Sequence, residues 1–368
     1  MKILHYLGSI WDGGVASIVY SLAKYTVSQG HQVDLLSMYT PPKSTDYKAK
    51  YDNIGVRTYF SDTNNRYSIK HISQLRNLMK DYDIIHIHQF PEQMHGALAS
   101  LLGNIKIKPK IITTEHSTWN NRRNHKLLQY LDRGMYSSYD KIVCISSHTE
   151  IALKSWLGSD KINTKITTIT NGIDISRYET AKNEIDNYIP YSPNDFYIGM
   201  AARMNHPKDP FTLIKALKFL PENVKIIFMG DGTLLPQAKQ LTQNLNLSDR
   251  IYFLGNVPDI SPIIKGCNIG VLSTLWDGFG LSAAEYMAAG IPAVVSEVDG
   301  LKDVVGDPAL WCKPQDEKSL AYIIKKLIED KSLYDLKVSS AKERVKKFSH
   351  EEMGKQYVTL YETLLGNK

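Results

Sequence analysis

The segment Leu275–Pro292 combines two carboxylates with the turn that begins a helix. An apolar run ends near Leu275, and a helix of small residues is predicted over 280–289 because Gly290 and Pro292 follow it. Asp277 and Glu285 are eight residues apart, which separates the carboxylates by about 10 Å. A retaining hydrolase needs its pair about 5 Å apart. The spacing instead favours contacts with two ends of one extended ligand, and the first helical amides offer an anion or sugar site. The residues of this turn are Gly278, Phe279, Gly280 and Leu281.

Two cations follow another apolar run in the second half of the chain. Arg203 and Lys208 come after the predicted strand 197–201. A planar guanidinium fork and a compact ammonium together suit a diphosphate. Gly230 and Gly232 follow the next predicted strand, 225–229, and indicate a tight strand-to-helix turn beside these cations.

The first half offers a glycine turn and a histidine at equivalent places. Gly13 and Gly14 follow the predicted strand 2–7 and allow close approach of a sugar or phosphate, although the pattern is not GxGxxG and implies no dinucleotide. His116 follows the predicted strand 110–114, where a group that titrates near neutrality is useful. Two alternatives stay open: the glycines serve only the fold, and His116 only makes local hydrogen bonds.

Two patterns that resemble metal sites are not expected to bind metal. His86 and His88 alternate on a predicted strand and share a face, but no third ligand is apparent, so buried and hydrogen-bonded histidines are favoured. Asp81 and Asp83 form a DxD string, but it precedes that strand and therefore lies at the amino edge of the sheet. No metal or other cofactor is expected.

Short apolar runs alternate with helical patterns along the whole chain, which predicts parallel sheets with helices on both faces. The fold class is α/β, with two Rossmann-like, doubly wound lobes and a ligand cleft between them. The lobes are expected at 1–175 and 190–349, with a linker at about 174–195 and with final helices at about 350–368 that pack back on the first lobe. The predicted strands are 2–7, 31–37, 56–60, 83–88, 110–114, 141–145, 166–170, 197–201, 225–229, 250–254, 269–273, 293–296 and 310–312.

The composition limits the classes of protein to which the chain could belong. The chain has 368 residues, of which 43% are hydrophobic and 22% are charged, so a globular protein is expected. It contains no apolar run of about 20 residues, and no secretion signal is expected. Its three cysteines form no zinc or disulfide pattern, and the expected location is the cytoplasm. Residues 1–175 hold 21 Lys and Arg against 14 Asp and Glu, within a net charge of +6. This excess is either solubilising charge or faces an anionic partner, and no nucleic-acid motif accompanies it.

The order of these motifs resembles the E-x7-E family of retaining, GT-B-fold glycosyltransferases over essentially the whole chain, and Asn171-Gly172-Ile173-Asp174 adds to the likeness. The resemblance implies that Glu285 binds the ribose and Asp277 the donor sugar. Asp277 stands where the family usually has Glu. Arg203 and Lys208 would neutralise the diphosphate with the amides of Phe279, Gly280 and Leu281. His116 would lie beside the reacting centre, and Gly13 and Gly14 would let the substrates approach.

The implied reaction is metal-independent hexosyl transfer with retention, from a UDP-sugar or alternatively a GDP-sugar. A glycan or a lipid-linked diphosphate would be the acceptor, in surface polysaccharide biosynthesis. Charge on the leaving group would be stabilised by prepositioned cations and a helix dipole. The alternatives are an isomerase of the nucleotide-sugar 2-epimerase type and a non-catalytic, two-lobed sugar binder.

A basic and apolar segment after His116 suggests where a lipid-linked acceptor could be met. On a helix, Leu127, Leu128 and Leu131 share a face, and a basic cluster precedes them by one turn. The cluster consists of Arg122, Arg123 and Lys126. The hypothesis is peripheral contact with an anionic membrane surface at the inner leaflet. The alternative is a helix that packs within the lobe and has a solvated basic end.

Overall fold

The chain folds into two compact units, described here one at a time. The computed structural model describes residues 1–10, 13–41, 47–61, 63–102 and 109–366. Unit 1 comprises Met1–Gly172 and His350–Lys368, and unit 2 comprises Ile173–Ser349. Both ends of the chain therefore belong to unit 1.

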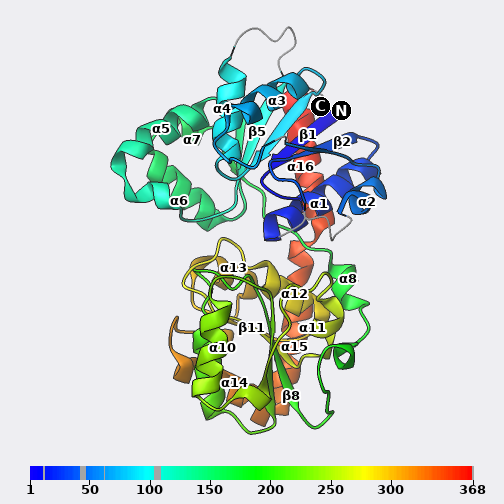
Figure 1. Cartoon of the computed structure of the whole chain (residues 1–368), viewed down its shortest axis with the longest axis vertical. Helices are drawn as coiled ribbons and strands as arrows, with labels where there is room; N and C mark the ends of the chain where they lie inside the picture. The colour runs from blue at the N-terminus through cyan, green and yellow to red at the C-terminus, as the bar shows by residue number, and fades with distance from the viewer. Residues whose placement is uncertain (11–12, 42–46, 62, 103–108, 367–368) are drawn as a thin grey trace. The chain divides into compact units, whose positions relative to one another are not determined.

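Unit 1 is a seven-stranded, fully parallel sheet in the order β3-β2-β1-β4-β5-β6-β7 (Figure 1). Its strands are β1 (Lys2–Leu7), β2 (Gln32–Ser37), β3 (Arg57–Phe60), β4 (Ile84–His88), β5 (Lys110–Glu115), β6 (Lys141–Cys144) and β7 (Ile166–Thr168). Its helices are α1 (Gly13–Ser28), α2 (Tyr47–Asp52), α3 (Ile69–Met79), α4 (Glu92–Leu101), α5 (Lys126–Ser137), α6 (Ser147–Leu157), α7 (Asp160–Asn163) and α16 (His350–Leu365). The strand order reverses between β1 and β4, the topological switch point at which such sheets bind ligands.

Unit 2 repeats the pattern with six parallel strands in the order β10-β9-β8-β11-β12-β13. Its strands are β8 (Phe196–Ala201), β9 (Val224–Met229), β10 (Ile251–Phe253), β11 (Ile269–Leu272), β12 (Ala293–Ser296) and β13 (Trp311–Cys312). Its helices are α8 (Ile175–Glu179), α9 (Pro210–Ala216), α10 (Leu235–Asn244), α11 (Ser261–Gly266), α12 (Leu281–Ala289), α13 (Asp299–Val305), α14 (Glu317–Glu329) and α15 (Lys331–Val345). Its switch point lies between β8 and β11.

The central strands are buried along their length, as expected where helices cover both faces of a parallel sheet. All five residues of β4 and all four of β11 are buried. The histidines of β4 therefore need partners inside the protein, because a buried polar group without a hydrogen bond is costly. Those partners come from β1, β5 and α16, as described below.

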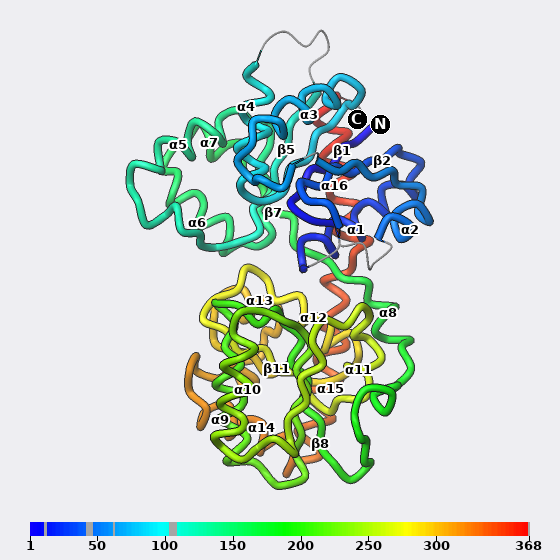
Figure 2. Tube along the Cα trace, viewed as in Figure 1, coloured from blue at the N-terminus to red at the C-terminus, as the bar shows by residue number. Residues whose placement is uncertain are grey.

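The C-terminal helix α16 packs against α1 in unit 1 (Figure 2). Two buried tyrosines of α16 also reach the sheet. The Tyr361 hydroxyl lies 2.7 Å from His86 Nδ1, and the Tyr357 hydroxyl lies 3.1 Å from Thr114 Oγ1. The last helix is thereby tied to β4 and β5 by hydrogen bonds as well as by apolar packing.

The predicted fold class, two doubly wound parallel lobes, is confirmed. The predicted strands are all present, with bounds that differ by at most two residues. The segment expected to be a linker, about 174–195, is more ordered than its sequence indicates, because it contains α8 and a 3-10 turn at Ile185–Asn187. These elements are too short to show a helical period.

None of the helices in the described ranges is long and apolar enough to cross a membrane. The three cysteines are free and buried, and burial raises the pKa of each thiol.

The contact between α16 and α1 leads to a prediction about stability. A Cβ atom on Gly354 would come within 2.4 Å of the ring of Tyr25 in α1. Gly354→Ala should therefore lower the free energy of unfolding by about 1–3 kcal/mol through overpacking. Gly134, in α5, has open space around its Cβ position, so Gly134→Ala is the matched control. It should stabilise the protein by about 0.5–1 kcal/mol. Urea unfolding measures both, and equal effects of the two substitutions would contradict this packing.

Candidate functional site

Two loops at the switch point of unit 2 are joined to each other. The Lys208 loop (residues 202–209) follows β8, and the Asp277 loop (residues 273–280) follows β11. Lys208 and Thr274 form an antiparallel bridge, and the Leu275 amide donates to the Pro207 carbonyl at 3.0 Å. This backbone pairing brings together two side chains that are 69 residues apart in the sequence.

Lys208 and Asp277 form an ion pair in which Nζ donates to Oδ2. The side chains are 20% and 14% exposed, so the pair is largely removed from water. Burial disfavours the carboxylate of Asp277. The charge and hydrogen bond of Lys208, with the amides of Phe279 and Gly280, outweigh that effect and hold the pKa of Asp277 below its usual value. Asp277 is therefore an anion at neutral pH.

The turn before α12 differs in one respect from the prediction for its amides. The Phe279 amide donates to Asp277 Oδ1 at 3.0 Å. This amide was expected to bind an external anion, but here it holds Asp277. Gly280 has a φ of 86°, and a Cβ there would meet Leu301 at 2.1 Å, so only glycine fits before the first residue of the helix, Leu281.

Glu285 lies within α12 and has a partner that sequence reasoning missed. The hydroxyl of Tyr178 and the charge of Arg177, both in α8, act on its carboxylate. Burial raises the pKa of Glu285, and these two groups only partly offset the rise. Arg177 is also paired with Asp259 at 2.7 Å. The Asn171–Asp174 stretch could have indicated this helix in the sequence, because Asp174 accepts a hydrogen bond from the Arg177 amide and caps α8.

Gly230 and Gly232 lie against the backbone of the Lys208 loop. Their φ angles are 141° and 154°, and a Cβ on either would clash with the carbonyl of Ala202 or Met204, at 2.0 and 2.4 Å. The structure thus brings the glycine turn and the Lys208 loop together as predicted from their places after β9 and β8. Arg203 is exposed and makes no ion pair with any described residue.

In unit 1, His116 directly follows β5 and is hydrogen-bonded within the fold. Its Nε2 lies 3.2 Å from Nδ1 of His88, at the end of β4. Burial lowers the pKa of His116 to about 3, so the ring is neutral at physiological pH. Gly13, with a φ of 86°, begins α1, and Gly14 is exposed.

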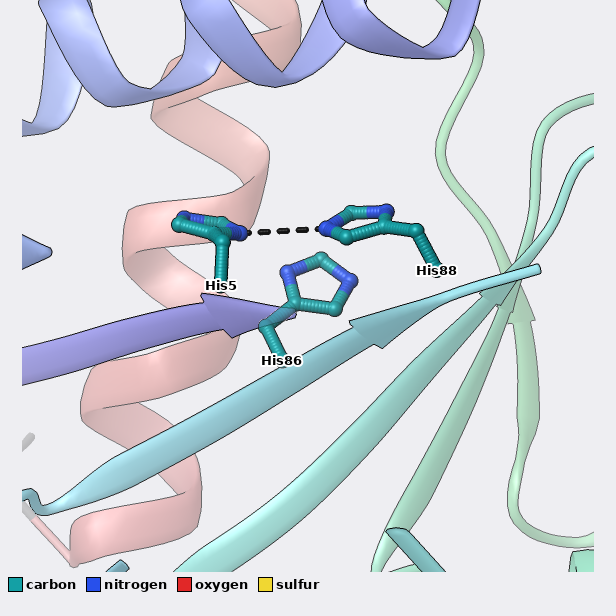
Figure 3. Close-up of side chains that lie close together, drawn as sticks. All are labelled: His5, His86 and His88. Atoms are coloured by element: carbon teal, nitrogen blue, oxygen red, sulfur yellow. Dashed lines mark hydrogen bonds between the residues drawn. The ribbon is translucent and has the colours of Figure 1, made fainter. Parts of the chain in front are cut away.

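The expectation that His86 and His88 lack a third neighbouring ligand is wrong. His5 of β1 joins them, and one ring nitrogen from each lies within 4.8 Å of the others (Figure 3). Sequence spacing missed His5 because it is about 80 residues away, although parallel pairing places it directly beside His86. In contrast, Asp83 lies at the amino edge as predicted, where it accepts from the Lys2 amide at 2.7 Å.

The basic segment after His116 is partly paired within unit 1. Arg122 forms a 2.9 Å ion pair with the buried Asp132, and Arg123 donates to the Thr118 carbonyl. Lys126 is exposed. Two members of the predicted basic cluster, Arg122 and Arg123, are therefore engaged by a buried carboxylate and a carbonyl within unit 1.

Comparisons with known proteins agree with this architecture. A family model described as Glycosyltransferase Family 4 matches residues 12–177, and one described as Glycosyl transferases group 1 matches residues 182–346. An Escherichia coli UDP-Gal:alpha-D-GlcNAc-diphosphoundecaprenol alpha-1,3-galactosyltransferase is 29% identical over 68% of each chain. N-acetyl-alpha-D-glucosaminyl L-malate synthase of Bacillus anthracis is 26% identical over 96% of this chain and 94% of that protein.

Solved structures resemble the whole chain. HepE of Anabaena in complex with UDP and glucose has a TM-score of 0.85 at 20% identity, covering 98% of this chain and 99% of that one. Sucrose-phosphate synthase of Thermosynechococcus elongatus has a TM-score of 0.84 at 19% identity and covers both chains fully. The fold is thus that of the GT-B glycosyltransferases. The chain belongs to the group 1 family of glycosyltransferases, with a Glycosyltransferase Family 4 domain before the group 1 domain.

The ion pair of unit 2 leads to a prediction with a defined pH dependence. Lys208→Met leaves the carboxylate of Asp277 buried without its cation and should destabilise unit 2 by about 1–3 kcal/mol at pH 7. Because the folded pKa of Asp277 lies below the unfolded value, the pair stabilises above the unfolded pKa. That stability is lost as the pH falls through the folded pKa. The deficit of the variant should therefore shrink in acid.

Lys331→Met is the matched control, since its pair with Asp335 is exposed. It should cost less than about 1 kcal/mol. Urea unfolding from pH 7 to pH 3 gives both values, and a Lys208→Met deficit that stays constant with pH would count against a charged Asp277.

Proposed function

We propose that the protein transfers a hexosyl group from a UDP-sugar to a lipid-linked diphosphate or glycan acceptor, with retention of anomeric configuration and without a metal ion. The observation that carries the proposal is the arrangement at the switch point of unit 2. There Lys208 and Asp277 are held together at the start of α12, with Glu285 one to two turns further along. Ligands of doubly wound sheets bind at this edge.

Each group at this edge has chemistry that fits one part of a nucleotide sugar. The anionic Asp277 accepts hydrogen bonds from hydroxyls of the sugar. Glu285, whose burial raises its pKa, gains most from new donors, and the two ribose hydroxyls would supply them. Lys208 and the exposed Arg203 neutralise the diphosphate.

The reaction proposed is departure of UDP with attack from the same face. Negative charge builds up on the diphosphate as the glycosidic bond breaks. Lys208, Arg203 and the amino end of α12 would stabilise that charge because all three lie at the carboxyl edge of the unit 2 sheet. In unit 1, His116 contacts the reacting sugar or the acceptor, while Gly13 and Gly14 keep the start of α1 free of side chains.

The names of similar proteins support the proposed substrate classes. The E. coli relative is named for UDP-galactose and a diphosphoundecaprenol acceptor, and HepE is bound to UDP and glucose. A UDP-sugar is therefore proposed over a GDP-sugar, a cytoplasmic location follows from the supply of such donors, and the acceptor is proposed to be a lipid-linked sugar diphosphate of polysaccharide biosynthesis.

The test is release of UDP from a panel of UDP- and GDP-sugars, with undecaprenyl diphosphate-linked GlcNAc as acceptor. UDP should form only with an acceptor present, EDTA should leave the rate unchanged, and NMR of the product should show the anomeric configuration of the donor. Arg203→Ala should lower kcat/KM by about tenfold or more, since a hydrogen bond to a charged group contributes about 1.5–3 kcal/mol. Lys218→Ala, an equal loss of charge at an exposed site, is the control.

Three results would count against the proposal. Activity lost in EDTA and restored by Mn²⁺ would revive Asp81 and Asp83. An inverted product would remove the retaining mechanism. Conversion of the donor to its epimer without any acceptor would favour the isomerase.

Contact with a membrane is proposed for α5. Leu127, Tyr130 and Leu131 are 80%, 66% and 69% exposed and follow the i, i+3, i+4 spacing of one helical face. Because Arg122 and Arg123 are engaged within the fold, this apolar stripe, with Lys126 beside it, is the part that would enter a lipid surface.

Sedimentation with vesicles tests this contact. Leu127→Ser/Leu131→Ser should weaken binding to anionic vesicles by more than tenfold, because burying each leucine contributes about 1.5–3 kcal/mol. Ile151→Ser removes an equally exposed apolar side chain from α6 and should have no effect. Protein that stays in the supernatant with anionic vesicles at low salt, or equal loss in both variants, would exclude α5 as the contact.

A further inference from the structure

Three histidines from neighbouring strands form a continuous chain of hydrogen bonds. His5 Nδ1 lies 3.1 Å from His88 Nε2, and His88 Nδ1 lies 3.2 Å from His116 Nε2. Figure 3 shows the first of these contacts beside the ring of His86. The rings come from β1, from β4 and from the residue after β5, so the chain crosses the switch point of unit 1 and ends at His116.

All three rings are neutral, which restricts how their protons can be arranged. Burial lowers the pKa of His5 and of His116 to about 3 and that of His88 well below its usual value. A neutral imidazole has one N–H donor and one acceptor. Each contact therefore needs one donor and one acceptor, and only two arrangements satisfy both. Either every ring carries its proton on Nδ1, or every ring carries it on Nε2.

The far end of the chain distinguishes these two arrangements. Nε2 of His5 is buried and has no hydrogen-bond partner among the described residues. If the protons are on Nδ1, Nε2 of His5 carries an unused lone pair. If the protons are on Nε2, this atom is a buried N–H without an acceptor. Orphaned N–H groups are the rarer of the two in protein interiors. The Nδ1–H arrangement is therefore the favoured one.

At the other end of this chain of hydrogen bonds, the Nδ1–H arrangement determines which atom of His116 can donate. His116 is partly exposed, and its Nδ1 bonds to no described residue. With Nε2 committed as an acceptor from His88, Nδ1 is left as a donor.

We infer that His88, backed by His5, is a positioning residue that holds His116 as the Nδ1–H tautomer, so that Nδ1 donates a hydrogen bond to a substrate hydroxyl. The inference rests on the proposed function for the role of His116, whereas the tautomer itself is a property of the free protein.

A metal ion bound by His5, His86 and His88 is the competing explanation for the cluster. However, His86 Nδ1 and Nε2 each lie 2.7 Å from a hydroxyl, of Tyr361 and Thr114. Both nitrogens of His88 are also in hydrogen bonds. Metal ligation would break the chain of hydrogen bonds between the histidines and free one of these hydroxyls. The existing hydrogen bonds therefore favour this chain over a metal site.

His86 provides the matched control. It lies on the same strand as His88, is equally buried and contacts the rings of His5 and His88, but its hydrogen bonds go to Thr114 and Tyr361 rather than into the chain. Substitution of His86 perturbs the cluster without touching the link to His116.

The experiment measures ring tautomers by NMR of protein labelled with ¹⁵N-histidine. Wild-type His116 and His88 should both show Nδ1–H. His88→Leu should shift His116 toward the Nε2–H form. His88→Asn keeps an amide donor near the position of Nδ1 and should preserve Nδ1–H at His116, and His86→Asn should leave it unchanged. An Nε2–H tautomer in wild-type His116 overturns the inference. So does a stoichiometric metal ion whose removal shifts the His5 and His88 signals.

Transfer assays complete the test. His88→Leu should lower kcat about tenfold, for loss of one oriented hydrogen bond, with little change in the donor KM. His88→Asn should recover most of that loss. Equal activity in His88→Leu and wild type, or equal loss in His88→Leu and His86→Asn, overturns the positioning role. A wild-type protein that transfers no sugar at all refutes the proposed function instead, and the tautomer measurement still decides whether the chain orients His116.

Discussion

Parallel pairing at the two switch points is the constraint on which both candidate sites depend. In each unit the strand order reverses beside the first strand, between β1 and β4 and between β8 and β11. Parallel strands all end at one edge, and helices that leave in opposite directions open a space there. The loops after β8 and β11 can consequently pair with each other, which places Lys208 against Asp277. The same constraint aligns His5 with His86 and brings β4 beside β5 in unit 1.

The sequence contains most of the fold because each strand is a short apolar run between turn residues, a local property that needs no knowledge of distant partners. The types of residue in the candidate site were also readable, since Asp277, Lys208 and His116 all follow such runs. The partners of these residues could not be predicted from the sequence. Tyr178 lies in a helix of five residues, which is too short to show a helical period. His5 lies inside a strand and is flanked there by apolar residues. Contacts over about 80 residues depend on strand order, which a single sequence does not specify.

The two units accommodate buried polar groups in opposite ways. Unit 2 keeps Asp277 charged, because one cation and two amides compensate for its removal from water. In unit 1, burial keeps the histidines neutral, and each ring is then both a donor and an acceptor. In the proposed function, Lys208 of the charged pair meets the diphosphate, and the neutral chain ends in one donor for a substrate hydroxyl.

The pairing at Asp277 also gives a structural reason for an aspartate at this position. Its Oδ1 accepts from the amide two residues ahead, the local contact that defines an Asx turn. A glutamate has one more methylene group and would not close that turn in the same geometry. The turn fixes the start of α12, and Oδ2 is held by Lys208. A carboxylate has about four lone-pair positions, and the Phe279 amide and the Lys208 ammonium occupy two of them here. Asp277 therefore keeps lone pairs for further donors, as the proposed contact with a sugar hydroxyl requires.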